Sequence, residues 1–364
     1  MSYPSPEAMS KAAWNARFQK SVQYVRNGDW AGLSRAVLQF AVWKLSFLPL
    51  GSLYHSLIRS MPARWQSKRE AAFWGSVETD RARQVSWDSI ECLGRMAVRE
   101  MTGGRWEQLM DVVIHTMTPP DLKRLPGLVL GCGDMAGEKW YFTHPALSFE
   151  RVDAYDISAE AIRRARQLTD SLGLNVQYHV EDVNAVQLPP ETYDLAVVAH
   201  SLHHFREIDH IVDQVNRSLK PGGVFVVWEY VGPRCQQFTC RQLDQATLVL
   251  QSLPKKYRRE LDGSIRKQAA SQPLYSISPD EAIRSDLILP ALKRMNIVYQ
   301  YNWAGLLFPL LRGGIAANFD QNDAEDRHNI EALFKLDRLL CQLGCVEPNY
   351  TITIAGRGAG AATC

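Results

Sequence analysis

The chain has 364 residues, of which 46% are hydrophobic and 22% are charged. This is the composition of an ordinary globular protein, and it excludes a disordered, collagenous or coiled-coil chain. The 41 basic and 39 acidic residues leave a net charge of +2, so there is no overall basic field of the kind that attracts nucleic acid. At about 150 residues per domain, the length accommodates one large domain or two ordinary ones.

Seven cysteines are scattered along the chain, and no two of them form a Cys-x-x-Cys motif. This argues against a zinc knuckle and against a thioredoxin-like redox motif. The first ten residues are polar and lack the apolar segment of a secretory signal, so we expect a cytoplasmic protein.

Residues 1–120 are predicted to form a helical N-terminal accessory region, because large apolar side chains recur at three- and four-residue spacing. The most apolar stretch, 33–50, holds about 15 uninterrupted residues, too few to cross a bilayer core of about 30 Å. Basic residues follow this stretch, which leaves contact with a membrane surface as an alternative to a buried helix. These helices would also suit the interface of a homodimer.

From residue 121 to 364 short apolar runs alternate with helical segments, which predicts a doubly wound, Rossmann-like α/β domain. The expected strands are 127–131, 149–155, 176–180, 193–199, 223–230, 296–302 and 350–355. The expected helices are 158–172, with Ser158 as its N-cap, 207–219 and 279–295. Two irregular segments, 231–278 and 303–349, are expected to cover the ligand end of the sheet as helical lids.

A glycine-rich segment, Gly131-Cys132-Gly133-Asp134-Met135-Ala136-Gly137, directly follows the first expected strand. Glycines at such a turn let the backbone approach a ligand closely, and such turns bind NAD, FAD and S-adenosylmethionine (SAM) alike. Asp156 ends the second strand, where a carboxylate can accept hydrogen bonds from the two ribose hydroxyls of an adenosine. Asp153 is the competitor for this role, and a helix cap is the alternative role for Asp156.

Polar residues also follow the third and fourth strands. In the segment Glu181-Asp182-Val183-Asn184 a carboxylate can accept a hydrogen bond from the exocyclic amine of adenine, although a polar loop would have the same composition. The segment His200-Ser201-Leu202-His203-His204 contains three histidines, but no second cluster has the spacing of metal ligands, so no metal site is expected. A histidine at this position can instead contact a cofactor or act as a general base near neutral pH.

Together with Leu219-Lys220-Pro221-Gly222-Gly223 before the fifth strand, these motifs resemble the class I SAM-dependent methyltransferases. The resemblance covers 125–230 firmly and 280–356 loosely. The segments from Trp228 to Arg234 and from Ser278 to Ser285 also resemble a bacterial subgroup that often accompanies glycan or specialised-metabolite pathways. The family resemblance implies a seven-stranded methyltransferase sheet with an antiparallel last strand. SAM is the implied cofactor, and its implied contacts are Gly131, Cys132, Gly133, Asp156, Ile157, Asp182, Val183 and His200.

Methyl transfer from SAM is an in-line displacement, so the protein mainly aligns the reactants in a dry site. O-methylation also needs a base for the acceptor hydroxyl, and His203 and Glu229 at strand ends are the catalytic candidates. We therefore expect O-methylation of a small-molecule or glycan acceptor, with S- or N-methylation of a small metabolite as the alternative. Basic residues in 231–278 favour an anionic acceptor, although a solvated helix face would look the same.

Two other classes of function compete with this one. A nicotinamide dehydrogenase is disfavoured because the glycine turn lacks the compact G-x-G-x-x-G form. A non-catalytic protein of this fold would bind a partner through its N-terminal helices, and the absence of SAM affinity would identify it. Nucleic acid is not an expected partner, because the sequence has neither a basic domain nor an Asn/Asp-Pro-Pro-Tyr/Phe segment for a flipped base.

Overall fold

The computed structural model describes residues 62–76, 87, 90–119, 121–271 and 278–358. The chain divides into two compact units, one of 1–66 with 272–279 and one of 67–271 with 280–364, and the elements discussed below belong to the second, apart from the first residues of α4. The apolar stretch 33–50 lies outside the described residues. Among the residues that are described, no helix has the length and apolar character needed to cross a bilayer.

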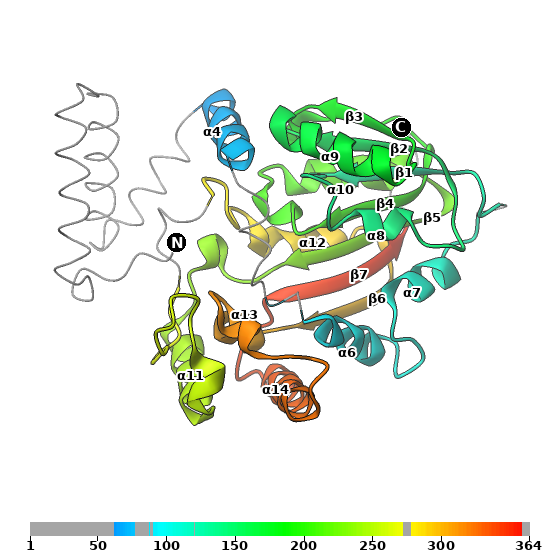
Figure 1. Cartoon of the computed structure of the whole chain (residues 1–364). Coiled ribbons are helices and arrows are strands. Elements are labelled where there is room, and N and C mark those ends of the chain that lie inside the picture. Colours follow the sequence, from blue (N-terminus) through cyan, green and yellow to red (C-terminus); the bar gives the residue numbers. More distant parts are fainter. Residues whose placement is uncertain (1–61, 77–86, 88–89, 120, 272–277, 359–364) are drawn as a thin grey trace, which may run out of the picture. The chain divides into compact units, whose positions relative to one another are not determined.

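A seven-stranded sheet forms the centre of the second unit, in the order β3-β2-β1-β4-β5-β7-β6 (Figure 1). Strand β7 is antiparallel to β5 and β6, and the other neighbouring pairs are parallel. All seven strands form where the sequence predicts them, and the antiparallel last strand is confirmed. The strands are β1 Leu125–Leu130, β2 Phe149–Asp156, β3 Val176–Val180, β4 Tyr193–Ala199, β5 Leu219–Tyr230, β6 Asn296–Trp303 and β7 Tyr350–Gly356.

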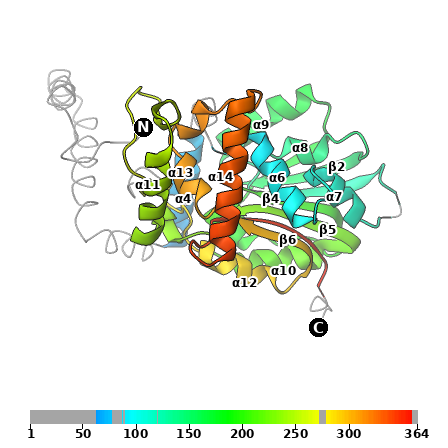
Figure 2. The same cartoon turned by 90° about the horizontal axis from the view of Figure 1, so that it is seen from below.

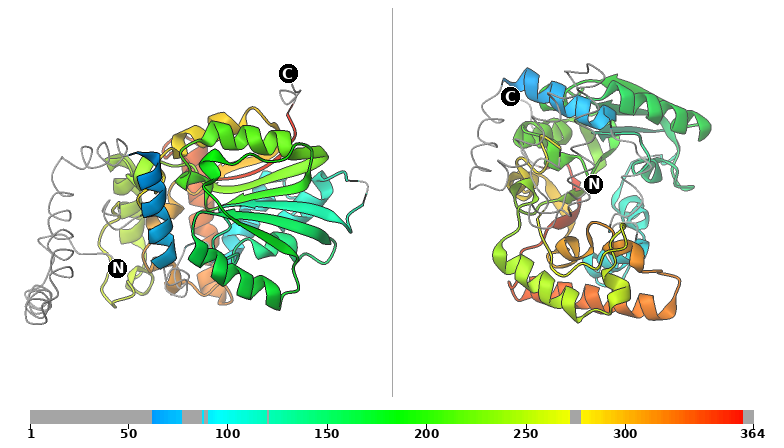
Figure 3. Two further views of the ribbon diagram at one scale, coloured as in Figure 1. Left: turned by 90° about the horizontal axis from the view of Figure 1, so that it is seen from above. Right: turned by 60° about the vertical axis from the view of Figure 1, so that its left-hand side comes forward.

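Helices cover both faces of the sheet (Figure 3). The described part of 1–120 forms three α-helices, which agrees with the predicted helical region. The α-helices are α4 Ala63–Ser76, α6 Glu91–Met101, α7 Leu109–Thr116, α8 Lys139–Phe142, α9 Ala159–Ser171, α10 Ile208–Ser218, α11 Cys240–Ser252, α12 Ile288–Leu292, α13 Leu307–Leu311 and α14 Ala324–Gln342. The short 3₁₀ helices are η2 Val183–Ala185, η3 Leu202–His204, η4 Arg234–Gln236, η5 Lys255–Arg258, η7 Ser285–Leu287 and η8 Ile315–Asn318.

Alternate side chains of the central strands enter two separate cores. On one face, Val129 of β1 and Val226 of β5 pack in a core that also contains residues of α6, α7, α9, α13 and α14. On the other face, Leu128 and Val227 pack with α10 and α12. Helix α14 lies over β6 on the first of these faces (Figure 2). Strands β1 and β4 are buried along their whole length, which explains why their sequences are apolar without alternation.

The helix predicted over 279–295 is wrong, because the segment forms turns, then η7 and the short helix α12. Ala282 adopts a left-handed backbone with φ 48°, which ends any helical path at that point. The N–H of Ile283 donates to the carbonyl of His203 at 3.2 Å, so the segment is bound to the loop after β4. Pro290 lies near the start of α12, where a missing N–H removes no helical hydrogen bond.

The sequence places 219–223 before the fifth strand, but this expectation is also wrong, because β5 already begins at Leu219. Leu219 pairs with Tyr193 of β4, and the register then shifts before Leu195 pairs with Val224. Gly222 has φ 82° within this irregularity. The glycines therefore form a bulge inside the strand, since the pairing with β4 continues on both sides of it.

Candidate functional site

Most of the predicted site residues lie at the carboxyl ends of the parallel strands, where ligands of open α/β sheets bind. The glycine turn follows β1, and its first two N–H groups, of Gly131 and Cys132, both donate to the carbonyl of Tyr155 on β2, at 2.8 and 3.0 Å. Gly131 has φ 69°, and a Cβ there would lie 2.5 Å from the Cβ of Ser201. Gly133 has φ 50°, but a Cβ there would meet no atom within 4 Å. The turn is thus closed against the loop after β4 at Gly131 and open at Gly133.

Asp156 ends β2 and binds the glycine turn directly. Its Oδ2 accepts the N–H of Gly133 at 2.8 Å, and its Oδ1 accepts the N–H of Ser158 at 2.8 Å. Ser158 is the N-cap of α9, as predicted, since its hydroxyl accepts the N–H of Ala161 at 3.2 Å. Burial raises the pKa of Asp156, although these two N–H groups lower it in part. Each carboxylate oxygen keeps a second acceptor position, so the contact with Ser158 leaves room for a hydroxyl ligand.

Asp182 follows β3 and already accepts several hydrogen bonds. Its donors are the backbone N–H and side-chain amide of Asn184, at 3.0 and 2.6 Å, the Ser67 hydroxyl at 2.5 Å and the Arg206 guanidinium at 3.1 Å. Burial alone would raise the pKa of Asp182, but these donors hold it below its ordinary value. Val183, next to it, is buried. An adenine amine that donates a hydrogen bond to Asp182 would share the carboxylate with the hydroxyl of Ser67, which belongs to α4.

The three histidines after β4 occupy different environments. His200 is exposed, has φ 54°, and its N–H donates to the carbonyl of Trp228 at 2.9 Å. His203 and His204 lie in η3, and both are buried. The ring centroids of these two histidines are 4.1 Å apart. The structure therefore separates His200 from the pair.

Glu229 fixes the loop that carries these histidines. Its Oε2 accepts the N–H groups of Ser201 and Leu202 at 2.9 and 2.6 Å, and its Oε1 accepts the N–H of Tyr230 at 2.6 Å and contacts Nδ1 of His203. The carboxylate is fully buried. Burial alone would raise the pKa of Glu229, but His203 and the N–H of Tyr230 lower it below its ordinary value. Glu229 therefore joins the end of β5 to the loop after β4.

His203 lies between two carboxylates. Nδ1 contacts Glu229, and Nε2 lies 3.3 Å from Oε1 of Glu281. Burial alone would lower the pKa of His203, but Glu229 and Glu281 together raise it to about 10. Burial would raise the pKa of Glu281, whereas His204 and His203 lower it to about 2. These two carboxylates therefore keep the His203 imidazole in its cationic form rather than as a neutral base.

His204 is enclosed by residues that the sequence does not single out. Its Nδ1 lies 3.2 Å from Oε1 of Glu70, and its Nε2 lies 3.9 Å from Oε2 of Glu281. The indole N–H of Trp74 donates to Glu70 at 2.7 Å, and the Trp74 ring packs edge-on against the His204 ring at 5.1 Å. Glu70 and Trp74 come from α4, and Glu281 comes from a turn. No local motif marks them, because they meet the histidines only through the fold.

An aromatic cluster with one arginine lies beside His203. The rings of Tyr230, Phe308 and Tyr350 lie 5.0–5.6 Å from each other, and the Tyr230 ring is 5.8 Å from His203. The Arg312 guanidinium stacks over Phe308 at 5.0 Å. Its Nη1 is buried without a hydrogen-bond partner among the described residues. Burial lowers the pKa of Arg312, and Glu281 offsets part of that effect.

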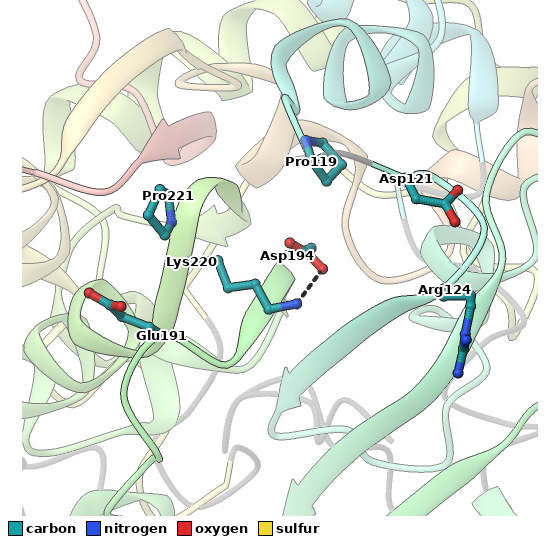
Figure 4. A pocket seen from close by; sticks show the side chains of 7 residues that line it. All are labelled: Pro119, Asp121, Arg124, Glu191, Asp194, Lys220 and Pro221. Atoms are coloured by element: carbon teal, nitrogen blue, oxygen red, sulfur yellow. Dashed lines mark hydrogen bonds and ion pairs between the residues drawn. The ribbon is translucent and has the colours of Figure 1, made fainter.

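A separate surface hollow of about 250 Å³ lies at the opposite end of the strands, beside the starts of β4 and β5 (Figure 4). Lys220 of β5 and Asp194 of β4 form an ion pair of 3.0 Å in its wall. None of the predicted site residues lines this hollow. The chemistry-bearing side chains therefore gather at the other end of the sheet.

Comparison with known proteins gives a family match in the central part of the chain. Residues 128–227 match the family model described as a methyltransferase domain. The chain is 30% identical over 109 residues to methyltransferase phqN of Penicillium fellutanum, covering 28% of this chain and 31% of that protein. It is 31% identical over 133 residues to the ubiquinone/menaquinone biosynthesis C-methyltransferase UbiE of Methylococcus capsulatus, covering 34% of this chain and 49% of that protein. The chain thus spans less than half the length of these curated relatives.

Solved structures also match the chain. A SAM-dependent methyltransferase from Mesorhizobium loti matches with a TM-score of 0.37 and 17% identity, covering 67% of this chain and 95% of that one. The geranyl diphosphate C-methyltransferase of Streptomyces coelicolor A3(2) matches with a TM-score of 0.44 and 12% identity, covering 82% of this chain and 100% of that one.

Proposed function

Because the chain contains a class I SAM-dependent methyltransferase domain, we propose that it transfers the methyl group of SAM to a small-molecule or glycan acceptor, most readily to an oxygen atom. One observation carries this proposal. The carboxylate at the end of β2, Asp156, is hydrogen-bonded to Gly133, and the space beside Gly133 is open. A ribose with two adjacent hydroxyls suits this carboxylate, which keeps acceptor positions for both.

The rest of the cofactor contacts follow from the order of the strand ends. The backbone of Gly131, Cys132 and Gly133 would face the cofactor where β1 ends, and Ile157 follows the ribose-binding carboxylate. Asp182 and Val183 would contact the adenine at the end of β3, with the exocyclic amine donating to Asp182. His200 is exposed at the end of β4, where its ring can approach the cofactor. Substitutions at these positions are expected to weaken the binding of SAM more than they weaken the binding of the acceptor.

An anionic acceptor is supported by the aromatic cluster beside the histidines. The buried Nη1 of Arg312 has no hydrogen-bond partner among the described residues, and an unpaired buried donor is costly. A carboxylate or phosphate on the acceptor would satisfy it, while the rings of Phe308 and Tyr230 would pack against the apolar part of the acceptor. Arg312 lies in the segment 303–349, one of the two segments that we propose as lids.

His203 and Glu229 are proposed to act at the acceptor end of this site as a pair. Glu229 holds the loop and the Nδ1 side of His203, so it positions the ring rather than receiving a proton from the acceptor. Nε2 of His203 faces Glu281. An acceptor hydroxyl therefore finds no uncommitted nitrogen on this ring, and its deprotonation needs a further group at the same place.

Calorimetric titration of the purified chain with SAM, and separately with NAD, tests the proposal. SAM should bind with micromolar affinity, Asp156→Ala should abolish the binding, and Asp170→Asn, an exposed change on α9, should leave it intact. A screen with methyl-labelled SAM then compares alcohols, phenols and sugars with amines, thiols and carbon acids, each with and without an anionic group. A folded protein that binds no SAM would overturn the proposal and favour a partner-binding role.

A further inference from the structure

Two histidines and one glutamate converge on a single point at the end of the sheet. Nε2 of His203 lies 3.3 Å from one oxygen of Glu281, and Nε2 of His204 lies 3.9 Å from the other. The potential ligand atoms of the three residues all lie within 4.8 Å of one another. The three come from η3 and from the turn before η7, so the fold assembles a cluster that the spacing along the chain does not show.

Each histidine is also oriented by a second carboxylate on its other nitrogen. Nδ1 of His203 contacts Glu229, and Nδ1 of His204 lies 3.2 Å from Glu70. Histidines that bind metals almost always donate their non-ligating N–H to a carboxylate or carbonyl, which fixes the tautomer and the ring orientation. Glu70 is itself held by the Trp74 indole and the N–H of Asp280. The same outer arrangement therefore occurs twice, and both rings point Nε2 at Glu281.

We propose that His203, His204 and Glu281 bind one divalent transition-metal ion of the zinc or iron(II) class through the two Nε2 atoms and the Glu281 carboxylate. Two imidazoles and one carboxylate form a ligand set typical of catalytic zinc and of non-haem iron(II). Three protein ligands leave coordination positions open for a small molecule. The set contains no thiolate and too few oxygen ligands for a calcium site.

The two nitrogen–oxygen distances suit such an ion with small movements. Metal–ligand bonds of about 2.0–2.2 Å place adjacent ligand atoms roughly 3.0–3.5 Å apart. The measured 3.3 Å is within that range, and the 3.9 Å needs a shift of about half an ångström or a turn of the Glu281 carboxylate. The charge also suits it, because the carboxylates of Glu70, Glu229 and Glu281 face the two imidazole rings, and a dication offsets part of their negative charge.

The role of the ion rests on the proposed function. An acceptor hydroxyl at an open coordination position would have a lowered pKa, as metal-bound water does, and would release its proton to solvent near neutral pH. Its oxygen would then attack the methyl carbon of SAM, forming the new carbon–oxygen bond as the sulfur–methyl bond breaks. The sulfonium becomes a neutral thioether, so charge and atoms balance. The ion would supply the deprotonation for which His203 has no uncommitted nitrogen.

Metal titration of the full chain, freed of any affinity tag and stripped with a chelator, tests the site. Zinc should bind by calorimetry with one ion per chain, and cobalt(II) should give the visible absorption of a nitrogen- and oxygen-ligated ion. His203→Gln, His204→Gln and Glu281→Gln should each weaken zinc binding by more than about 100-fold, and Glu70→Gln by about 10- to 100-fold. His328→Gln removes an exposed histidine on α14 and should leave the affinity unchanged.

The outcomes separate this inference from the proposed function. Absence of zinc and cobalt binding in a folded wild-type chain would overturn it, as would binding that the three ligand variants leave unchanged. SAM titration of the same preparations, together with thermal unfolding, shows whether each variant is folded. Zinc binding that depends on the cluster, in a chain that binds no SAM, would support the metal site and contradict the proposed function. SAM binding by a chain that binds neither zinc nor cobalt would support the proposed function and contradict the metal site.

Discussion

The N–H of Gly133 donates to the Asp156 carboxylate at 2.8 Å, which joins the glycine turn after β1 to the acidic end of β2. Asp156→Asn keeps the size of this side chain but replaces one acceptor oxygen by a donor. We expect SAM affinity to fall by about 10- to 100-fold, because hydrogen bonds to a charged group contribute roughly 1.5–3 kcal/mol. Calorimetric titration measures it, with Asp170→Asn as the surface control. Equal affinity in the Asn variant and the wild type would contradict the assigned role of Asp156.

Two glycines of the same turn should respond differently to alanine. A Cβ at Gly131 would lie 2.5 Å from Ser201, so Gly131→Ala should lower the free energy of unfolding by about 2–3 kcal/mol. A Cβ at Gly133 meets no atom, so Gly133→Ala should cost only about 1 kcal/mol for its positive φ. It should, however, weaken SAM binding because the methyl group occupies the open space. Denaturant unfolding and SAM titration on both variants measure the contrast, and the opposite order of effects would refute it.

Glu229→Gln should destabilise the chain strongly. The NH₂ group that replaces one oxygen cannot accept the N–H groups that this oxygen accepts, and His203 loses a charged partner. Breaking a buried ion pair on one side costs about 3–5 kcal/mol, so we expect a loss of that size in the free energy of unfolding. Glu331→Gln removes a half-exposed partner of Lys335 and should change stability by less than about 0.5 kcal/mol. A small effect at Glu229 would show that the loop after β4 is held by other contacts.

Arg312→Met retains the length and apolar packing of the arginine but removes its charge. We expect the apparent KM for an anionic acceptor to rise by about 10-fold or more, since a charge-assisted contact is lost. The KM for SAM should stay unchanged. Arg241→Met, an exposed change on α11, is the matched control. Steady-state kinetics with a charged and an uncharged acceptor decide the question, and an equal rise for both would assign Arg312 to packing.

Asp337 should give the chain a measurable pH dependence of stability. Burial raises the pKa of Asp337 to about 6, although the N–H groups of Leu306, Leu307 and Ala304 lower it in part. A carboxyl whose pKa is higher in the folded state binds more protons there, so its stabilisation is complete below the unfolded pKa near 4 and is lost as the pH rises through 6. A shift of this size corresponds to roughly 3 kcal/mol.

The measurement compares the wild type with Asp337→Asn by denaturant unfolding between pH 4 and pH 7. The stability of the wild type relative to the variant should fall between pH 4 and about pH 6 and level off above that, because only the aspartate ionises. A constant difference between the two proteins would show that the Asp337 pKa is not raised.

The sheet follows from the sequence because its signals are local. Strands β1 and β4 read as continuous apolar runs, and such runs are typical of parallel strands buried on both faces. The glycine turn and Asp156 were predictable for the same reason, since each lies directly at a strand end. The start of β5 was not predictable, because Leu219 pairs with Tyr193 and extends the strand through the glycines.

Only part of the cluster around the histidines can be predicted from the sequence. The sequence marks His203, His204 and Glu229 as candidates, since they lie at strand ends. Glu70 and Glu281 have none, because one lies in α4 and the other in a turn where the sequence favours a helix. Their identification requires the long-range packing, as does that of Arg312, whose unpaired nitrogen is visible only in three dimensions.

Strand β7 lies between β5 and β6, although it is made later than either of them. During synthesis the edge of β5 therefore stays without its neighbour until residues 350–356 have left the ribosome, and β6 has nothing to pair with in the sheet. An exposed strand edge invites pairing with other chains. The newly made polypeptide thus passes through a stage in which its five parallel strands can form but its final edge cannot. Ribosome-bound chains halted before Tyr350 should be the ones most dependent on chaperones.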